Sequence, residues 1–201
     1  MGFETLKLDP LILKALEDQG YKATTDIQAK AIGHILNGRD ILGQADTGTG
    51  KTAAFGLHLL ERIDTSIKST QALVLAPTRE LGQQIAEQLN TFSKYMEKVN
   101  VLPVYGGAPI VNQIRALKRT QHVIIATPGR LIDLIKRKAV RLENLRFLII
   151  DESDEILNMG FKEEIDKILS YTPDDKLTWL FSATMPSEIK RIVDTYMDDP
   201  V

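Results

Sequence analysis

From about residue 40 onward, short apolar runs alternate with longer stretches in which apolar residues recur with helical spacing. The apolar runs are Asp40–Gln44, Ala72–Ala76, Val99–Val104, His122–Ala126, Phe147–Ile150 and Thr178–Phe181. The helical stretches are Thr52–Ile63, Glu80–Met96, Ile110–Leu117, Gly129–Lys136 and Lys162–Leu169. This alternation predicts an α/β fold in which helices cover both faces of a mostly parallel sheet.

A glycine-rich loop follows the first apolar run and opens the first of these helices. In such a loop, backbone N–H groups and the helix N-terminus attract phosphate oxygens. Lys51 is placed to reach the β- and γ-phosphates of a nucleoside triphosphate, and the Thr52 hydroxyl to coordinate Mg²⁺. We expect Lys51 to be exposed on the loop, outside the core. The alternative is a plain strand–helix turn. The candidate nucleotide ligands are Ala45, which stands where the usual motif begins with glycine, Thr47, Gly48, Thr49, Gly50, Lys51 and Thr52.

Two helical patterns, Pro10–Asp18 and Asp26–Leu36, precede the first predicted strand. The chain shows no repeat, low-complexity tract or internal linker. We therefore expect residues 1–38 to form a helical region that packs beside the nucleotide edge of a core domain spanning residues 39–201.

Two carboxylates follow the buried-type strand Phe147–Ile150. Ligands of parallel sheets bind beyond the carboxyl ends of the strands, so this position lies near the phosphate loop. Asp151 can hold Mg²⁺, in part through water, opposite Thr52. Glu152 is then placed to orient and deprotonate an attacking water. A solvated acidic turn is the alternative.

Composition limits the classes of function that remain. The 201 residues include 25 basic and 27 acidic ones, so any nucleic-acid surface must be a local patch. The absence of cysteine excludes disulfides and thiolate metal sites. No apolar run approaches the ~20 residues of a membrane span, and no signal peptide precedes the first helix. We therefore expect a soluble, cytoplasmic protein without a membrane partner.

Several ordered motifs identify a resemblance. They are Pro77-Thr78-Arg79-Glu80-Leu81, Gly106-Gly107, Thr127-Pro128-Gly129-Arg130, Asp151-Glu152-Ser153-Asp154 and Ser182-Ala183-Thr184. Together with the phosphate loop, they resemble the N-terminal RecA-like domain of DEAD-box RNA helicases, most closely the bacterial members. The resemblance covers the chain from Phe3 to its end. Ser153 stands where the family usually has alanine.

The resemblance implies ATP and Mg²⁺ as cofactors and RNA as a partner. It implies that Ser182 and Thr184 couple hydrolysis to unwinding. It further implies RNA sugar–phosphate contacts, which position a strand without reading its sequence, from Thr78, Arg79, Gly107, Thr127 and Arg130. The sequence at Thr127–Arg130 also reads as an ordinary helix start, with proline in the first turn.

An adenine site is also implied by the resemblance. Gln28 would read the adenine edge, Thr25 would support the loop, and Phe3 would stack on the base. Thr25 and Gln28 also have the spacing of a helix capping box, which is a purely structural role. The loop departs from the family pattern at Thr24 and Asp26, where prolines are common. Asp46 departs in the phosphate loop, where the family commonly has glutamine, lysine or arginine.

The family's second RecA-like domain, which carries the arginine fingers, has no counterpart up to Val201. We therefore expect an isolated domain that binds nucleotide and hydrolyses ATP weakly or not at all. The open alternatives are a non-catalytic nucleotide- or partner-binding module and an ATPase that acts on DNA. The basic cluster of Lys136–Lys138 and Arg141 is more readily read as a solvated turn than as an auxiliary RNA patch. We expect Trp179 to pack in the core.

Overall fold

A computed structural model describes residues 2–6, 8–45 and 48–201. Its strands are β1 (Ile41–Gln44), β2 (Ala72–Leu75), β3 (Val101–Val104), β4 (Val123–Ala126), β5 (Phe147–Ile150) and β6 (Leu177–Ser182). Its helices are η1 (Phe3–Leu6), α1 (Pro10–Asp18), α2 (Asp26–Leu36), α3 (Lys51–Arg62), α4 (Arg79–Phe92), α5 (Ile110–Leu117), α6 (Pro128–Lys136), α7 (Ser153–Asn158), α8 (Lys162–Leu169) and α9 (Ser187–Tyr196).

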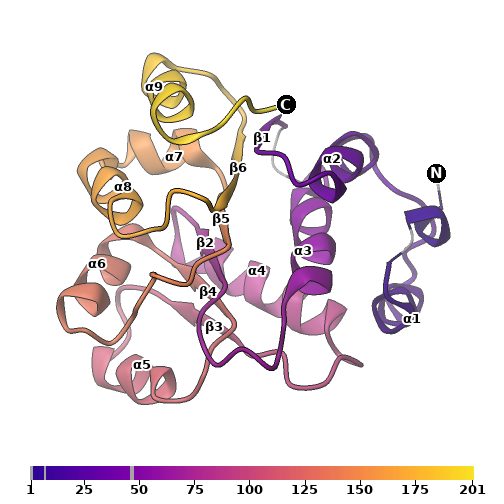
Figure 1. The fold of residues 1–201 in the computed structure, drawn as a ribbon, viewed down its shortest axis with the longest axis horizontal. Helices are drawn as coiled ribbons and strands as arrows, with labels where there is room; N and C mark the ends of the chain where they lie inside the picture. Colours follow the sequence, from indigo (N-terminus) through magenta and orange to yellow (C-terminus); the bar gives the residue numbers. More distant parts are fainter. Residues whose placement is uncertain (1, 7, 46–47) are drawn as a thin grey trace.

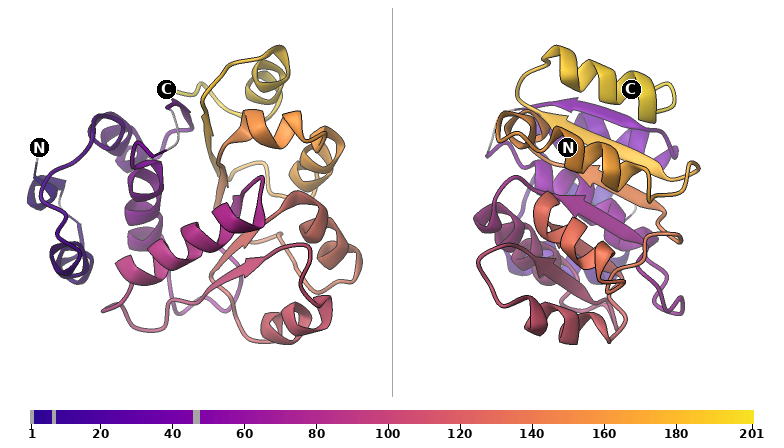
Figure 2. Two further views of the ribbon diagram at one scale, coloured as in Figure 1. Left: turned by 180° about the vertical axis from the view of Figure 1, so that it is seen from behind. Right: turned by 90° about the vertical axis from the view of Figure 1, so that its left-hand side faces the viewer.

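The six strands form one sheet in the order β1-β6-β5-β2-β4-β3, and every pairing within the described residues is parallel. Figure 1 shows α2 and α3 on one side of this sheet, and α6, α8 and α9 on the other. Figure 2 shows the same layers from behind and from the side. The predicted α/β fold with helices on both faces is confirmed.

Strand side chains alternate between two buried clusters, as the pleat requires. In β5, Phe147 and Ile149 join the cluster under α3 and α4, whereas Leu148 and Ile150 join the cluster under α6 and α8. Trp179 is fully buried, as expected. Because both faces are covered, the strands read as continuous apolar runs in the sequence.

The N-terminal helices pack on the same core. Phe3 and Ile12 belong to the same buried cluster as Phe55 of α3. Contacts join α2 to α3 and β1, and α1 to α4. No helix in the described part of the chain is long and apolar enough to cross a membrane.

The chain after α9 returns to the first strand. Val201 donates its backbone N–H to the carbonyl of Asp40, and its own carbonyl accepts from the N–H of Leu42. The buried Asp40 carboxylate accepts from the N–H of Thr178 at 2.7 Å and from that of Asp198 at 2.8 Å. The tail, residues 197–201, is therefore bonded to β1 directly and to β6 through Asp40.

Two predicted boundaries differ from the structure by more than one residue, and two α-helices lie outside the predicted ranges. α4 ends at Phe92, short of the predicted Met96. The Ser93 hydroxyl donates to the Leu89 carbonyl at 2.8 Å, which competes with continuation of the helix. β3 begins at Val101, two residues after the predicted start. The apolar pattern of the sequence predicts neither α7 nor α9.

Candidate functional site

The carboxyl ends of the parallel strands gather the motif residues along one edge of the sheet. Ala45 follows β1, Asp151 follows β5 and Ser182 ends β6, and these three strands are neighbours. The predicted RNA-binding residues follow the neighbouring strands β2, β3 and β4. The strand order therefore divides the predicted site residues along this edge into a predicted nucleotide half and a predicted RNA half, which meet between β5 and β2.

The phosphate loop enters α3 through glycines in the left-handed region. Gly48 has φ 80° and Gly50, the N-cap of α3, has φ 87°, values that other residues adopt only with strain. Asp46 and Thr47 lie outside the described residues. Gly48 and Gly50 thus lead the chain into the N-terminus of α3, a position that attracts phosphate oxygens.

The burial of Lys51 differs from what we expected. Its side chain is only 6% exposed, although we expected it to be exposed outside the core. Its Nζ donates to the Ala45 carbonyl at 3.2 Å and lies 3.7 Å from Asp151 Oδ1. The burial has a physical reason, because Asp151 and the loop carbonyl together compensate the ammonium charge.

Asp151 is the most perturbed acid of the site. Its side chain is 2% exposed, and burial raises its pKa to about 6; the positive charge of Lys51 opposes this rise and the neighbouring Glu152 adds to it. Its Oδ1 accepts from the backbone N–H of Glu152 at 2.9 Å. Glu152 itself has φ 49°, an uncommon conformation for a non-glycine residue and one found at functional sites. The strand-to-helix turn therefore fixes the Asp151 carboxylate and the backbone of Glu152.

A cleft of about 550 Å³ joins the phosphate loop to the acidic turn. Its lining includes Lys51, Thr52, Asp151 and Glu152, together with Thr78 from the next strand's loop. A hydroxyl and carboxylates are the oxygen ligands that Mg²⁺ prefers, so the residues fit this ion. Four further polar side chains line the cleft, none of them among the predicted site residues: Tyr21, Glu80, Gln84 and Gln88.

The start of α2 is hydrogen-bonded to the phosphate loop. Thr25 Oγ1 donates to the Thr49 carbonyl at 2.9 Å, and Gln28 Nε2 donates to the Gly50 carbonyl at 3.1 Å. Gln28 Oε1 accepts from the N–H of Thr25 at 2.9 Å, which is one half of the capping box. Phe3 is 4% exposed, and its ring meets Tyr21 edge-on at 5.8 Å between centroids. Thr25 and Gln28 are therefore brought to the phosphate loop, whereas Phe3 lies within the core.

The turn after β6 is joined to the acidic turn. Thr184 donates to Asp154 Oδ2 from its N–H at 2.9 Å and from its hydroxyl at 2.8 Å. Burial alone would raise the pKa of Asp154, but these hydrogen bonds hold it below its usual value. Ser182 Oγ donates to the Thr184 carbonyl at 2.6 Å. The fully buried Ser153 donates to the Phe181 carbonyl at 3.1 Å, so the hydroxyl at this position is satisfied.

Asp154 had no role in the sequence analysis beyond its place in the motif. Its place in the motif puts it in the first turn of α7, but its partner Thr184 comes from a distant loop. Gln44 is a second such residue, since its Nε2 donates to the Ala183 carbonyl at 3.3 Å. These contacts connect the phosphate-loop strand, the acidic turn and the Ser182–Thr184 turn.

The predicted RNA residues are held in place by their neighbours. Thr78 caps α4 by accepting from the N–H of Leu81 at 3.2 Å. The guanidinium of Arg79 lies over the Tyr105 ring, 5.5 Å from its centroid. Gly107 has φ 82°, and a Cβ there would lie 3.8 Å from Arg79 Nη1.

Arg130 closes the same group of loops. Its guanidinium donates twice to the Ala108 carbonyl at 3.1 Å and once to Gln113 Oε1 at 3.0 Å. Thr127 is the N-cap residue of α6, and Pro128 occupies the first turn of that helix. Arg130 therefore ties the start of α6 to the loop that follows Gly107.

Comparison with known proteins identifies the family. A family profile described as DEAD/DEAH box helicase matches residues 25–192 of the chain. The chain belongs to this family. It is 50% identical, over 198 residues, to the DEAD-box ATP-dependent RNA helicase CshA of Bacillus cereus, covering 98% of this chain and 38% of that protein. The ATP-dependent RNA helicase DeaD of Escherichia coli is also 50% identical over 198 residues, with 98% of this chain and 32% of that protein covered.

Solved structures support the same assignment. A DEAD box protein from Methanococcus jannaschii superposes with a TM-score of 0.95 at 40% identity, covering all of this chain and 55% of that one. An ATP-dependent RNA helicase, described as hypothetical, from Sulfolobus tokodaii gives a TM-score of 0.90 at 36% identity, covering 96% of this chain and 56% of that one. The fold is RecA-like, as predicted. The chain spans little more than a third of the curated relatives and about half of the solved ones.

Proposed function

We propose that this chain binds ATP, hydrolyses it with Mg²⁺, and contacts the RNA sugar–phosphate backbone as the N-terminal half of an RNA helicase. The observation that supports this most strongly is the single cleft lined by the phosphate loop, Asp151 and Glu152. We retain the proposed division into a helical region of residues 1–38 and a RecA-like domain of residues 39–201.

The nucleotide half has a group for each step of phosphoryl transfer. Lys51 lies at the start of α3, where it can shift from Asp151 and the Ala45 carbonyl to the β- and γ-phosphates. Thr52 and Asp151 would hold Mg²⁺, which when bound neutralises the charge on the phosphates. Glu152, on the same cleft, orients the attacking water and accepts its proton. The Asp151 carboxylate accepts from the backbone N–H of Glu152, which places the two residues side by side on the cleft.

Adenine recognition by Gln28 is compatible with its contacts. Within the described residues, each side of the amide uses one hydrogen bond, which leaves a second position on its oxygen and on its nitrogen. Gln28 is only 2% exposed, so a bound adenine would have to open a way to this amide. An adenine edge needs one donor and one acceptor. Phe3 would have to turn out of its buried place beside Tyr21 to stack on the base.

The RNA half would position a strand by its backbone. Helix N-termini at α4 and α6 favour phosphate, and Thr78 and Thr127 stand at these two ends. Arg79, Gly107 and Arg130 complete the proposed contact set. Ser182 and Thr184 are proposed to couple hydrolysis to unwinding, because Thr184 is bonded to Asp154 of the acidic turn.

The second RecA-like domain is proposed as an essential partner. An arginine finger contributes about 10³–10⁵ in rate to phosphoryl transfer. We therefore expect residues 1–201 alone to bind nucleotide but to hydrolyse it weakly or not at all.

The test has two arms. The first titrates a fluorescent ATP analogue into residues 1–201 with Mg²⁺, and binding is expected. The second measures ATP hydrolysis by the chain joined to a relative's second domain, with RNA, with DNA and with neither. Hydrolysis stimulated by RNA supports the proposal, whereas stimulation by DNA alone would reassign the polymer. Nucleotide binding without hydrolysis in any condition would identify a non-catalytic binding module.

A further inference from the structure

A second groove lies at the opposite, amino-terminal edge of the sheet. Three loops line it, each leading into a strand: residues 68–70 before β2, 117–121 before β4 and 138–144 before β5. Its volume is about 370 Å³. The groove is therefore separate from the ATP cleft and from the proposed RNA residues, which follow the carboxyl ends of the strands.

The charge of this groove is one-sided. A single acidic side chain, Glu143, lines it beside five cationic ones: Lys68, Lys118, Arg119, Lys138 and Arg141. All five cations are exposed, and within the described residues none of them forms an ion pair. Because the whole chain has 25 basic and 27 acidic residues, this imbalance is local. Uncompensated cations in a concave surface raise the local concentration of polyanions.

The same edge is acidic at its other end, under β1 and β6. A hollow of about 660 Å³ there is lined by Asp40, Asp174, Asp175, Asp198 and Asp199, with Arg39 and Lys176 as its basic side chains. The amino edge is thus segregated by charge. A polyanion would be attracted to the amino edge beside β2, β4 and β5 and repelled from the amino edge beside β1 and β6.

Lys138 adds a conformational observation. It follows the C-terminus of α6 with φ 55°, and its N–H donates to the Ile135 carbonyl at 2.8 Å. Glycine is the common residue at such a helix end, because it adopts the left-handed region without strain. In this chain the position holds a lysine that lines the groove.

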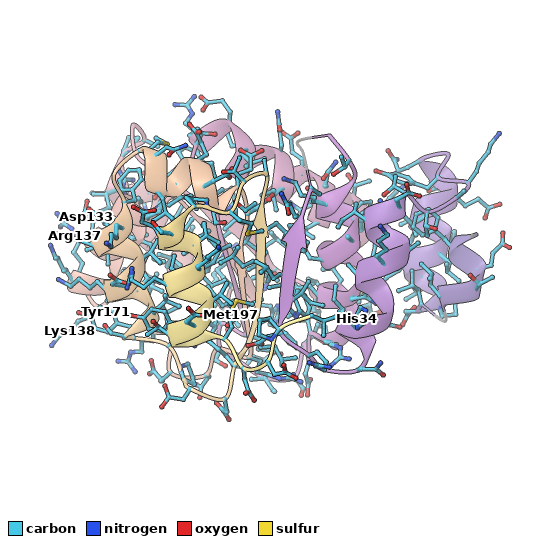
Figure 3. The ribbon with its side chains drawn as sticks, turned by 90° about the horizontal axis from the view of Figure 1, so that it is seen from above. His34, Asp133, Arg137, Lys138, Tyr171 and Met197 are labelled. Carbon is cyan, nitrogen blue, oxygen red and sulfur yellow. The ribbon has the colours of Figure 1, made fainter. Side chains whose placement is uncertain are left out.

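An exposed aromatic ring extends the groove. A smaller hollow of about 270 Å³ shares Lys138, Arg141 and Glu143 with the first one and adds Tyr171, which is 45% exposed. Figure 3 shows Arg137, Lys138 and Tyr171 at the same end of the molecule. Cations that follow a backbone, next to an aromatic ring on which a base can stack, are the combination that binds single-stranded nucleic acid.

We propose that this amino-edge groove, comprising Lys68, Lys118, Arg119, Lys138, Arg141 and Tyr171, binds a single-stranded RNA segment. The proposal rests on the proposed function for the choice of RNA as the polymer. The cations contact phosphates, and Tyr171 offers a stacking face to one unpaired base. RNA fits better than an acidic protein segment because Tyr171 gives a base a partner that a carboxylate does not need.

Binding is tested on residues 1–201 with a fluorescein-labelled oligouridine of about 16 nucleotides, near the upper site size of a single-strand-binding domain. The groove variant is Lys138→Asn with Arg141→Gln, since asparagine tolerates the left-handed conformation. The control is Lys98→Asn with Lys167→Gln. Lys98 is exposed with φ 65°, and neither control residue lines the groove. Both variants lose two positive charges.

We expect the groove variant to bind the RNA about tenfold more weakly at low salt, with a logarithmic salt slope reduced by about 1.4, as two lost phosphate contacts imply. The control should change affinity by less than about twofold, because exposed charges away from the strand are screened. Ultraviolet cross-linking followed by peptide mass mapping should place an RNA adduct on Tyr171. Tyr171→Phe should retain the wild-type affinity and Tyr171→Ala should lose it in part.

Equal RNA affinities of the groove and control variants would overturn the proposal. Wild-type RNA affinity in Tyr171→Ala, or RNA adducts confined to the carboxyl edge of the sheet, would overturn it as well. Absence of RNA binding by the wild-type chain would overturn it too. A titration with the fluorescent ATP analogue on the same samples keeps the two questions apart, since the groove variants should bind nucleotide like the wild type. Tight binding of an acidic peptide that displaces the RNA would assign the groove to a protein partner instead.

Discussion

Replacing Lys51 by methionine should destabilise the fold, and the loss should depend on pH. Lys51 and Asp151 are 6% and 2% exposed, and their charged atoms lie 3.7 Å apart. At an effective dielectric constant of about 20, two unit charges at this distance attract by about 4 kcal/mol. The actual loss is smaller, because Asp151 can take up a proton once its cation is removed.

The free energy needed to protonate Asp151 sets the size of the stability loss. With Lys51 present, burial holds the pKa of Asp151 at about 6. Protonating it at pH 7.5 therefore costs about 2 kcal/mol, at about 1.4 kcal/mol per pH unit. In the unfolded state, Asp151 ionises at its ordinary pKa in both the wild type and Lys51→Met. Its contribution to the free energy of the unfolded state therefore cancels when the two proteins are compared. A carboxyl with a raised pKa favours the folded state more as the pH falls, so the deficit of Lys51→Met should shrink towards zero near pH 6.

Urea denaturation without Mg²⁺ or nucleotide, at pH 7.5 and pH 6, measures this difference. The control places Lys51→Met in an Asp151→Asn background, where no carboxylate is left unpaired, and the cost there should fall to less than about half. Equal stability of Lys51→Met and wild type at pH 7.5, or a deficit that is the same at both pH values, would refute the reasoning.

Three further predictions concern the site and the core. Glu152→Gln in the form joined to a second domain should bind ATP normally and lose about 10²-fold in turnover, the scale of a lost general base; normal turnover in a steady-state assay would make Glu152 structural. Burial lowers the pKa of the fully buried His58 to about 4, so the unfolded chain takes up its proton first as the pH falls below 6.5. Between pH 7.5 and 5, wild type should lose about 2 kcal/mol more unfolding free energy than His58→Leu, as followed by chemical denaturation. Gly43→Ala should cost about 1–3 kcal/mol, because its Cβ would lie 2.5 Å from the ring of Phe181. Gly106→Ala, with nothing within 4 Å, is the matched control, and equal melting temperatures of the two would contradict the steric argument.

The predictable parts of the fold are those fixed by local pattern. The ranges of α5 and α8 match the predicted ones, because their apolar spacing is clear and their flanking residues end the helix. The predicted β5 also matches, as a short apolar run between polar residues. By contrast, α4 ends four residues before the predicted Met96, and Lys94 and Tyr95, beyond its end, contact Asp18 of α1. That partner is distant in sequence and carries no local signal.

In the candidate site, too, the features with a local sequence signal were predicted and those that depend on distant residues were not. Glycine spacing and the strand–helix context predict a loop between a strand and a helix, and the structure has it between β1 and α3. The burial of Lys51 depends on Asp151, which is distant in the chain, and a lysine beside a loop otherwise predicts exposure. Likewise, Gln84 and Gln88 line the cleft because α4 passes it, although nothing in their own segment marks them as functional.

The return of the tail to β1 has a mechanical consequence. The two backbone hydrogen bonds that join Val201 to Asp40 and Leu42 have the pattern of a parallel bridge. A pull along the chain at Val201 would load both bonds together in shear, so the bridge resists tension better than a pair that opens one bond at a time. The strand that receives this load ends one residue before Ala45, where the phosphate loop begins. Tension applied at Val201 is thereby delivered through β1 to the phosphate loop.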